Sequence, residues 1–499
     1  MKIWFDTTSV SQLSRDDCAR APRELPPIKF PLPRGDIQSI LARTLKQRDP
    51  LYVQACDERW LVCDPTGSGR LAVLDTSAFL LLEEFRTTQR PLDVMQEASA
   101  QPPSGFEEAV ALFYTLGFLQ DIQQPALEHH GTDSDTLTAW LHVTNACNLS
   151  CQYCYISKTN EHMSDNTVHK AVDAVFRSAL KQHFSHVKLK YAGGEASLHL
   201  ARVIDLHDYA LSQAQQYGLA LDAQLLSNGV ILSQASIDQL KARQIGITIS
   251  LDGIGAAHDS QRPFTNGQGS FRYVDRTLTR LLANNVIPHI TVTVSQRNLA
   301  GLPDVISYVL ERELPFTLNY YRDNECSTHI RDLQFADEQM ITSMRTVFTI
   351  ISRNLPKYSL MGSLLDKADL TSAHQHTCGV GRNYLVIDQR GGVAKCQADI
   401  KQTITTIERD DPLQVVRDDL KGIQSLSVDE KEGCRTCEWR YWCTGGCPLL
   451  TYRATGRYDV KSPNCNIYKA LFPEVLRLEA LRLLKYESPV SLEYAIENL

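Results

Sequence analysis

Ten of the fourteen cysteines in this 499-residue chain fall into two regularly spaced groups. Three stand together as C-x3-C-x2-C, at Cys147, Cys151 and Cys154. Seven more follow in the last quarter of the chain, at Cys378, Cys396, Cys434, Cys437, Cys443, Cys447 and Cys465. The scattered remainder, Cys18, Cys56, Cys63 and Cys326, is interpreted as small buried hydrophobic residues. In a reducing compartment, clustered cysteines indicate metal or redox chemistry rather than disulfide bonds.

The first group supplies too few ligands for a closed metal site. A structural zinc ion normally takes four protein ligands, and the four irons of a [4Fe–4S] cluster are usually held by four Cys. Three cysteines would leave one iron of such a cluster free to bind another molecule. A plain zinc site and three buried thiols remain the alternatives at this point.

The second group exceeds what one site can use. Four of its members are spaced C-x2-C-x5-C-x3-C, at Cys434, Cys437, Cys443 and Cys447. Upstream, Cys378 and Cys396 bracket the segment NYLVIDQRGGVAKC, which reads as a hairpin. Seven cysteines indicate two metal centres, with a single rubredoxin-like or zinc-ribbon site as the alternative.

Composition excludes several classes of protein. A net charge of −7 argues against a basic surface that binds nucleic acid, and 43% hydrophobic residues suffice for large cores. No segment approaches the roughly 20 apolar residues of a membrane helix, and the amino terminus lacks an apolar signal core. We therefore expect a cytoplasmic protein without membrane or nucleic-acid partners.

Residues 136–330 alternate between strand and helix patterns, and this segment must position the first cysteine group. The expected strands are 138–144, 187–192, 222–226, 246–251, 289–294 and 316–320. Alternation of this kind predicts a parallel α/β sheet with right-handed crossovers, and six units predict a partial (β/α)6 barrel that is open on one side. The first cysteines follow the first strand, at the carboxyl edge where such sheets bind ligands.

The flanking segments predict further domains. Residues 1–50 are Pro-rich and read as an amino-terminal extension. Residues 51–125 carry two strands around a turn at 66–69 and then three helices, the last with Ser104 and Glu107 as a capping box and Gly117 as its stop. This pattern predicts a small winged-helix domain. Residues 331–377 should form a helical bridge, and residues 378–485 a Cys-rich domain with a closing helix over 467–484.

The segment CNLSCQYCY resembles the signature of the radical SAM enzymes. The resemblance implies a [4Fe–4S] cluster whose free iron is chelated by S-adenosyl-L-methionine (SAM), which is cleaved to a 5′-deoxyadenosyl radical. Further matches stand at successive strand ends, and the residues implied in SAM binding are Tyr153, Gly193, Gly194, Glu195, Ser227, Asn228, Ser250, Asp252 and Arg262. His258 is interpreted as a residue that orders its loop rather than as a catalyst. The general base stays unassigned.

The second group resembles the seven-cysteine SPASM domain that follows some radical SAM barrels. This implies two auxiliary [4Fe–4S] clusters, and hence three clusters in all. One would use Cys434, Cys437, Cys443 and Cys465, and the other Cys378, Cys396 and Cys447. The latter set is one ligand short, so that cluster is either open or completed by a group such as His374 or His376.

The segments GRLAVLDTSAFLLLEEF and LFYTLGFLQD resemble the RiPP recognition element, a PQQ-chaperone-like fold that binds leader peptides of ribosomal precursors. In this mode the leader adds as a strand to a sheet edge. The combined resemblance implies a maturase that abstracts hydrogen from a precursor peptide and then cross-links its side chains, by a cyclophane-type carbon–carbon bond, an ether-type bond or a thioether. A reductase, flavodoxin or ferredoxin would donate electrons.

Two alternatives carry different chemistry. An anaerobic sulfatase maturase, which makes formylglycine, shares both cysteine regions, but such enzymes place Asp where Gln397 follows Cys396. An iron–sulfur regulator that binds DNA through the winged helix is the other alternative.

Overall fold

The computed structural model describes residues 1–6, 31–97, 105–123 and 135–492. Its largest element is a nine-stranded sheet in the order β12-β11-β10-β9-β8-β7-β13-β14-β15. Six of these strands are parallel and follow the chain in order: β7 (Thr136–Thr144), β8 (His186–Gly193), β9 (Ala220–Ser227), β10 (Gly246–Ser250), β11 (His289–Val294) and β12 (Phe316–Tyr320). This arrangement confirms the predicted partial α/β barrel.

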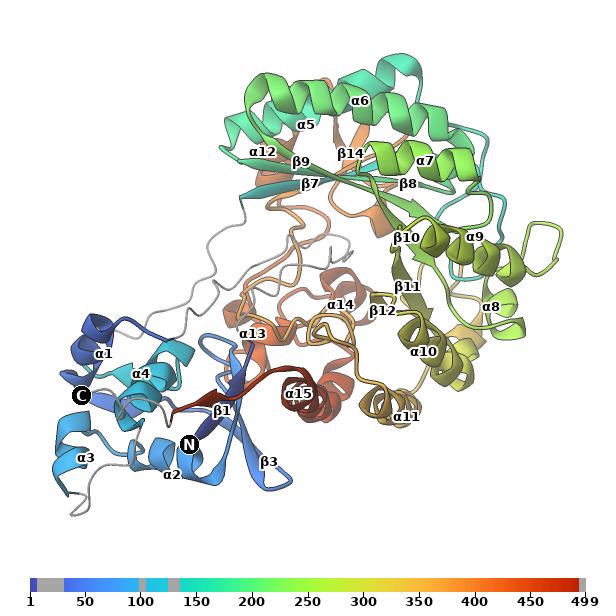
Figure 1. The fold of residues 1–499 in the computed structure, drawn as a ribbon. Helices are drawn as coiled ribbons and strands as arrows, with labels where there is room; N and C mark the ends of the chain where they lie inside the picture. The colour runs from blue at the N-terminus through green and yellow to red at the C-terminus, as the bar shows by residue number, and fades with distance from the viewer. Residues whose placement is uncertain (7–30, 98–104, 124–134, 493–499) are drawn as a thin grey trace.

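Helices connect the barrel strands and cover the outer face of the sheet (Figure 1). They are α5 (Asp165–Lys181), α6 (Leu200–Tyr217), α7 (Gln234–Ala242), α8 (Ala256–Gln261), α9 (Phe271–Ala283) and α10 (Leu302–Glu311). Helix α5 begins where the Ser164 side chain accepts a hydrogen bond from the Thr167 amide, and it buries Val168, Val172 and Val175 as its spacing predicts.

The Cys-rich region extends the same sheet. Strand β13 (Tyr384–Ile387) lies parallel to β7, and β14 (Gly392–Ala394) and β15 (Thr403–Thr406) continue antiparallel. The sequence predicts the β13–β14 hairpin but not its attachment to the barrel. Attachment follows because β7 is buried along its whole length and would otherwise present an open edge.

A smaller module contains a five-stranded sheet in the order β16-β1-β5-β4-β3. The strands are β1 (Lys2–Phe5), β3 (Tyr52–Cys56), β4 (Arg59–Cys63), β5 (Leu71–Leu74) and β16 (Val490–Ser491). Residues 1–50, expected as an extension, contribute β1, α1 (Arg34–Leu41) and β2 (Leu45–Gln47) to this module, and β2 pairs with β6 (Leu119–Asp121). Both described ends of the chain thus join one sheet (Figure 1).

Three further helices complete this module: α2 (Thr76–Glu84), α3 (Pro91–Glu97) and α4 (Phe106–Leu116). Helix α4 ends at Gly117 as predicted, because the φ of 84° there suits glycine. The Ser104 of the expected capping box lies outside the described residues. Gly105 precedes α4, which begins at Phe106 without a side-chain cap.

The remaining helices join the two sheets. Helices α11 (Asp337–Arg353) and α15 (Cys465–Tyr486) pack against each other, in agreement with the expected helices in both segments. Short helices α12 (Pro412–Asp418), α13 (Arg440–Cys443) and α14 (Pro448–Thr455) lie in the Cys-rich region.

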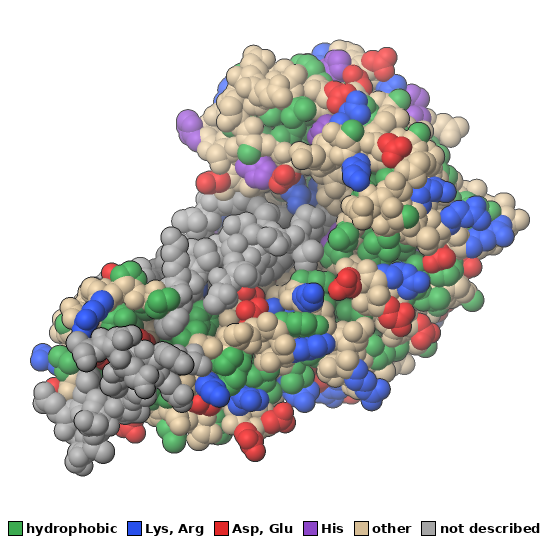
Figure 2. All heavy atoms as spheres, in the orientation of Figure 1, with side chains coloured by type: hydrophobic (Ala, Val, Ile, Leu, Met, Phe, Trp, Pro, Cys, Tyr) green, Lys and Arg blue, Asp and Glu red, His purple; other side chains and the backbone are tan. Residues whose placement is uncertain are grey.

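The surface carries charges of both signs. On the face drawn in Figure 2, basic and acidic side chains are interspersed over the lower half of the molecule. No helix in the described part of the chain is long and apolar enough to cross a membrane.

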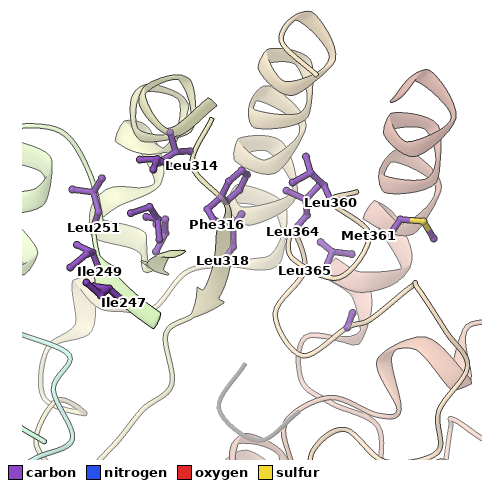
Figure 3. Close-up of a cluster of buried hydrophobic side chains, with 14 of the residues drawn as sticks. Ile247, Ile249, Leu251, Leu314, Phe316, Leu318, Leu360, Met361, Leu364 and Leu365 are labelled. Atoms are coloured by element: carbon purple, nitrogen blue, oxygen red, sulfur yellow. The ribbon is translucent and has the colours of Figure 1, made fainter. Parts of the chain in front are cut away.

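A continuous hydrophobic core holds the barrel against the bridging helices. Ile247, Ile249 and Leu251 from β10 and its end, and Phe316 and Leu318 of β12 on the far side of β11, belong to one cluster. Leu360, Met361, Leu364 and Leu365 continue it (Figure 3). The same core includes Cys63 and Leu71 of the small sheet. The module is therefore packed onto the rest of the protein.

We expect Arg482→Met to lower the melting temperature by several degrees. Arg482 is 4% exposed; it donates to Glu479 Oε1 at 2.7 Å and to Asp6 Oδ2 at 2.7 Å, so it connects α15 to the amino terminus. Removing one partner of a buried ion pair costs about 3–5 kcal/mol. The control Arg345→Met, at an exposed pair with Glu474, should cost less than about 1 kcal/mol. Equal melting shifts for the two variants would contradict this account.

Candidate functional site

Cys147, Cys151 and Cys154 lie half-buried in the loop between β7 and α5, at the carboxyl edge of the barrel sheet. The Leu149 amide donates to Cys147 Sγ at 3.4 Å. Burial raises the pKa of Cys151 to about 12, so this thiol stays protonated unless a positive centre binds it. A metal cluster supplies such a centre, because its thiol ligands bind as thiolates.

Gly193 and Gly194 hold this loop through its backbone. A Cβ on Gly193 would lie 2.4 Å from the Thr144 carbonyl oxygen, and one on Gly194 would lie 2.5 Å from that of Ala146. The amides of Gly194 and Glu195 donate to the same two carbonyls, at 2.7 and 2.8 Å. Glycine is required here because the strand end touches the segment that leads into Cys147.

Glu195 joins the ends of β8 and β9. Its Oε1 accepts from Ser197 Oγ at 2.5 Å and from Ser227 Oγ at 2.8 Å, and its Oε2 accepts from the Asn228 amide at 2.6 Å. The carboxylate is 2% exposed. These three expected residues are therefore brought together, with Oε2 the less heavily used oxygen.

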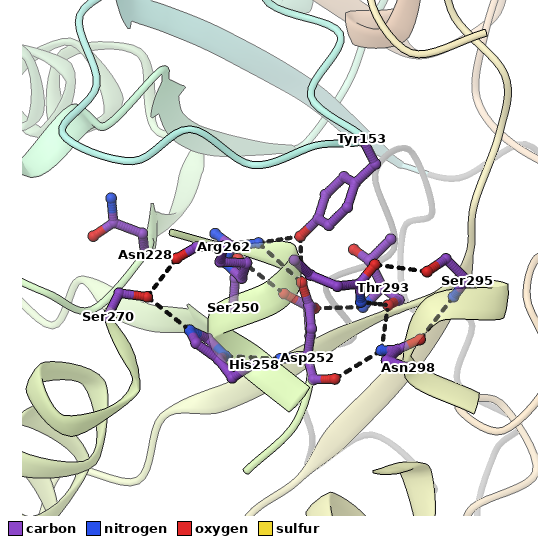
Figure 4. A network of polar contacts seen from close by, with 12 residues as sticks. Tyr153, Asn228, Ser250, Asp252, His258, Arg262, Ser270, Thr293, Ser295 and Asn298 are labelled. Carbon is purple, nitrogen blue, oxygen red and sulfur yellow. Dashed lines mark hydrogen bonds and ion pairs between the residues drawn. The ribbon is translucent and has the colours of Figure 1, made fainter. Parts of the chain in front are cut away.

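Tyr153, Asp252 and Arg262 form a buried polar network at the end of β10 (Figure 4). Tyr153 Oη donates to Asp252 Oδ2 at 2.5 Å, and Arg262 Nη1 donates to Tyr153 Oη. Burial raises the pKa of Asp252, and the Arg262 charge opposes that shift. The buried Nε of Arg262 finds no hydrogen-bond acceptor within the described ranges. It is a donor available to an anionic group beside Cys151.

His258 hydrogen-bonds to the backbone of this network. Its Nδ1 accepts from the Asp252 amide at 3.2 Å, and its Nε2 contacts Ser270 Oγ at 3.1 Å (Figure 4). Burial lowers the pKa of His258 to about 3, so the ring is neutral at physiological pH. Ser250 Oγ accepts a weak hydrogen bond from Thr291 Oγ1 at 3.5 Å.

The sequence-based prediction does not include two residues that lie at the site. Asn148 Oδ1 accepts from Asn228 Nδ2 at 2.7 Å, and Asn324 Nδ2 donates to the Tyr153 carbonyl at 3.1 Å. Asn148 lies inside the first cysteine motif, which is a usable signal. Asn324 follows β12 without any motif, and only the fold brings it to Tyr153.

A pocket in the Cys-rich region brings together Cys434, Cys437, Cys443 and Cys465. Trp439, Tyr468 and Phe472 also line it. Burial raises the pKa of Cys443 to about 12 and that of Cys434 to about 11. Four thiols around one pocket fit a cubane cluster of four irons.

Cys378, Cys396 and Cys447 share a second hydrophobic cluster, together with Cys154 of the first motif. Of the two candidate completing residues, His374 Nδ1 contacts the Ser372 carbonyl at 3.0 Å, and His376 Nδ1 faces the Arg382 guanidinium. Across the described ranges, no three His, Cys, Asp or Glu side chains converge as they would on a single metal ion.

The model of the radical SAM superfamily matches residues 141–306. This range begins in β7 and ends in α10, and it contains the first cysteine motif and the strand ends described above. Residues 141–306 are therefore similar to the radical SAM superfamily, whose members use a [4Fe–4S] cluster and SAM.

Two curated relatives and one solved structure extend the comparison. The chain is 24% identical over 244 residues to the sporulation killing factor maturation protein SkfB of Bacillus subtilis, covering 48% of this chain and 56% of SkfB. It is 24% identical over 179 residues to the antilisterial bacteriocin subtilosin biosynthesis protein AlbA of the same organism, covering 35% and 36%. The chain thus spans about a third to about half of these relatives.

The solved structure is native anSMEcpe with bound AdoMet and Cp18Cys peptide. It aligns with 69% of this chain and 98% of its own, with a TM-score of 0.55 and 18% identity. At this identity the match supports the fold.

Gly194→Ala should lower the iron bound after anaerobic reconstitution by about four per chain, one cluster's content. The added Cβ would displace the backbone that leads into Cys147. Gly35→Ala is the matched control, because a Cβ there meets nothing within 4 Å and Ala is the better helix former. Iron and sulfide analysis measures the effect. Full iron content in Gly194→Ala would mean that this contact does not position the ligands.

Proposed function

We propose that this chain is a radical SAM enzyme, and more specifically a maturase that modifies a ribosomally synthesised precursor peptide. When bound, the cluster and SAM would supply the chemistry of hydrogen abstraction from a core residue, through a 5′-deoxyadenosyl radical. Side-chain cross-linking then follows, as a cyclophane-type carbon–carbon bond or a thioether. The observation that carries the proposal is the cysteine loop held over successive barrel strand ends, in a chain related to peptide maturation proteins.

In this proposal, Cys147, Cys151 and Cys154 hold the SAM-binding cluster, and the strand ends hold SAM. The free acceptor capacity of Glu195 Oε2 suits an ammonium group, and the buried Arg262 Nε suits a carboxylate. Gly193 and Gly194 act by positioning the cysteine loop, and Tyr153 fixes Arg262 and Asp252.

The Cys-rich region is proposed to carry two auxiliary [4Fe–4S] clusters. The four-thiol pocket supports the set of Cys434, Cys437, Cys443 and Cys465. Cys378, Cys396 and Cys447 would hold the other cluster, with its fourth position open or filled by another group. These clusters would accept the surplus electron of cross-linking, and a reductase, flavodoxin or ferredoxin would supply the electron for SAM cleavage.

The amino-terminal module is proposed to bind the leader peptide. Strand β3 ends its sheet and pairs, within the described ranges, with β4 alone. An added strand could therefore continue the sheet at β3. Tyr52 of β3 contacts Trp439, with 5.0 Å between ring centroids, so a leader at this edge would lie near the four-thiol pocket.

The two alternative functions have less support. Gln397 Oε1 accepts from Tyr384 Oη at 3.0 Å, so a buried amide stands where similar sulfatase maturases place an Asp. A net charge of −7 gives little support to a DNA-binding surface, and the face drawn in Figure 2 carries mixed charges rather than a continuous basic patch.

Cys151→Ala should abolish the reductive cleavage of SAM to 5′-deoxyadenosine, because the loop would lose one of its three iron ligands. Product is quantified by liquid chromatography after reduction with dithionite, without peptide. The control Cys56→Ala, at a buried cysteine of β3, should retain cleavage. Cleavage at the wild-type rate in Cys151→Ala would refute the proposed activity.

Proline substitution at the β3 edge should weaken leader binding at least tenfold. Successive residues of a strand direct their N–H groups to opposite sides, so one of Gln54→Pro and Ala55→Pro removes a donor at the open edge, and the other removes a donor toward β4. The substitution at the open edge removes no hydrogen bond of the folded sheet, so the variant whose melting temperature is unchanged is the informative one. Fluorescence anisotropy measures affinity, with a labelled leader from the short open reading frames sought beside the gene. Unchanged affinity in that variant would exclude strand addition at β3.

A further inference from the structure

Lys431 is a buried lysine between the two cysteine sets of the Cys-rich region. Lys431 is 2% exposed, and it directly follows the short helical turn 428–430. Its Nζ donates to the Thr444 carbonyl at 2.7 Å. Thr444 lies between Cys443, which belongs to the four-thiol pocket, and Cys447, which belongs to the other set.

The backbone beside the ammonium has an unusual conformation, with strain at Thr444. Thr444, Gly445 and Gly446 all have positive φ, at 47°, 78° and 68°. A β-branched residue such as Thr is rarely found there. A Cβ on Gly445 would lie 2.6 Å from Lys431 Cδ, so the lysine stem requires glycine at this position.

A second contact ties the same loop to Cys378. Thr377 Oγ1 donates to the Thr444 carbonyl at 3.1 Å or to that of Gly446 at 2.8 Å, and Thr444 Oγ1 lies 2.9 Å from Thr377 Oγ1. Cys378 is the next residue. The Lys431 ammonium therefore sits where the segments that carry both sets meet.

The groups that would favour the charged form of Lys431 are cysteines of both sets, in their thiolate form. Burial lowers the pKa of Lys431, whereas Cys434, Cys378, Cys443 and Cys447 raise it. In the described part of the chain, Lys431 forms no ion pair with a carboxylate. By contrast, Lys395 Nζ lies 2.9 Å from Asp419 Oδ2. A buried ammonium needs anionic neighbours, and metal-bound thiolates would supply them.

We propose that Lys431 is the shared counter-cation of the two auxiliary clusters and raises the reduction potential of both. The inference rests on the proposed function, because it requires both clusters. Reduction adds one electron, and so one negative charge, to a cluster. A fixed positive charge nearby, in a site that excludes water, stabilises that reduced state. Lys431 is thus a positioning residue for charge, not a catalytic residue.

The test is an anaerobic redox titration of the full-length reconstituted protein, followed by electron paramagnetic resonance. Lys431→Met removes the charge, and Lys431→Gln removes it while keeping a donor for Thr444. We expect both auxiliary potentials to fall by at least about 59 mV, which is a tenfold change for one electron. The control Lys469→Met removes an exposed cation beside Cys465, and it should shift one potential by less.

The outcomes are distinguishable. Unchanged potentials in a neutral variant with full iron content would overturn the proposal, as would a shift confined to one cluster. Loss of the auxiliary iron in both neutral variants would also overturn it, because Lys431 would then serve assembly only. A wild-type protein with about four rather than about twelve irons per chain would instead refute the two auxiliary clusters of the proposed function.

Discussion

Strand β7 is the element on which the rest of the structure depends. It hydrogen-bonds to β8 on one side and to β13 on the other, and all nine of its residues are buried. The loop with the first three cysteines leaves its carboxyl end, while β13 brings the second cysteine region to its edge. Because a paired strand cannot slip without moving every side chain to the other face, this one strand fixes both regions relative to each other.

The site at the carboxyl edge is built mostly from backbone contacts. Gly193 and Gly194 touch the carbonyls of Thr144 and Ala146, and Glu195 receives donors from two strand ends. Such contacts leave the cysteine loop little freedom. Rigid support of this kind is what a cofactor site needs, because ligands must be held before the cofactor binds.

Buried cations accompany the cysteines in two separate places. Arg262 lies beside Cys151 at the barrel edge, and Lys431 lies among thiols of the Cys-rich region. A buried positive charge is costly without an anionic neighbour. Both placements are therefore consistent with thiolates bound to metal, and they connect the electrostatics of the fold with its proposed electron transfer.

The sequence by itself determined the parallel α/β barrel, the grouping of ten cysteines and the residues at successive strand ends. These features are local, because they depend on hydrophobic period and on spacing within one segment. Only the tertiary structure decided that β1 and β16 join one sheet from opposite ends of the chain, that β13 extends the barrel, and that Asn324 reaches Tyr153. It also decided that Lys431 lies between two cysteine sets. Pairings between distant segments depend on which edges and faces remain unfilled once the local elements have formed, and no local pattern records that.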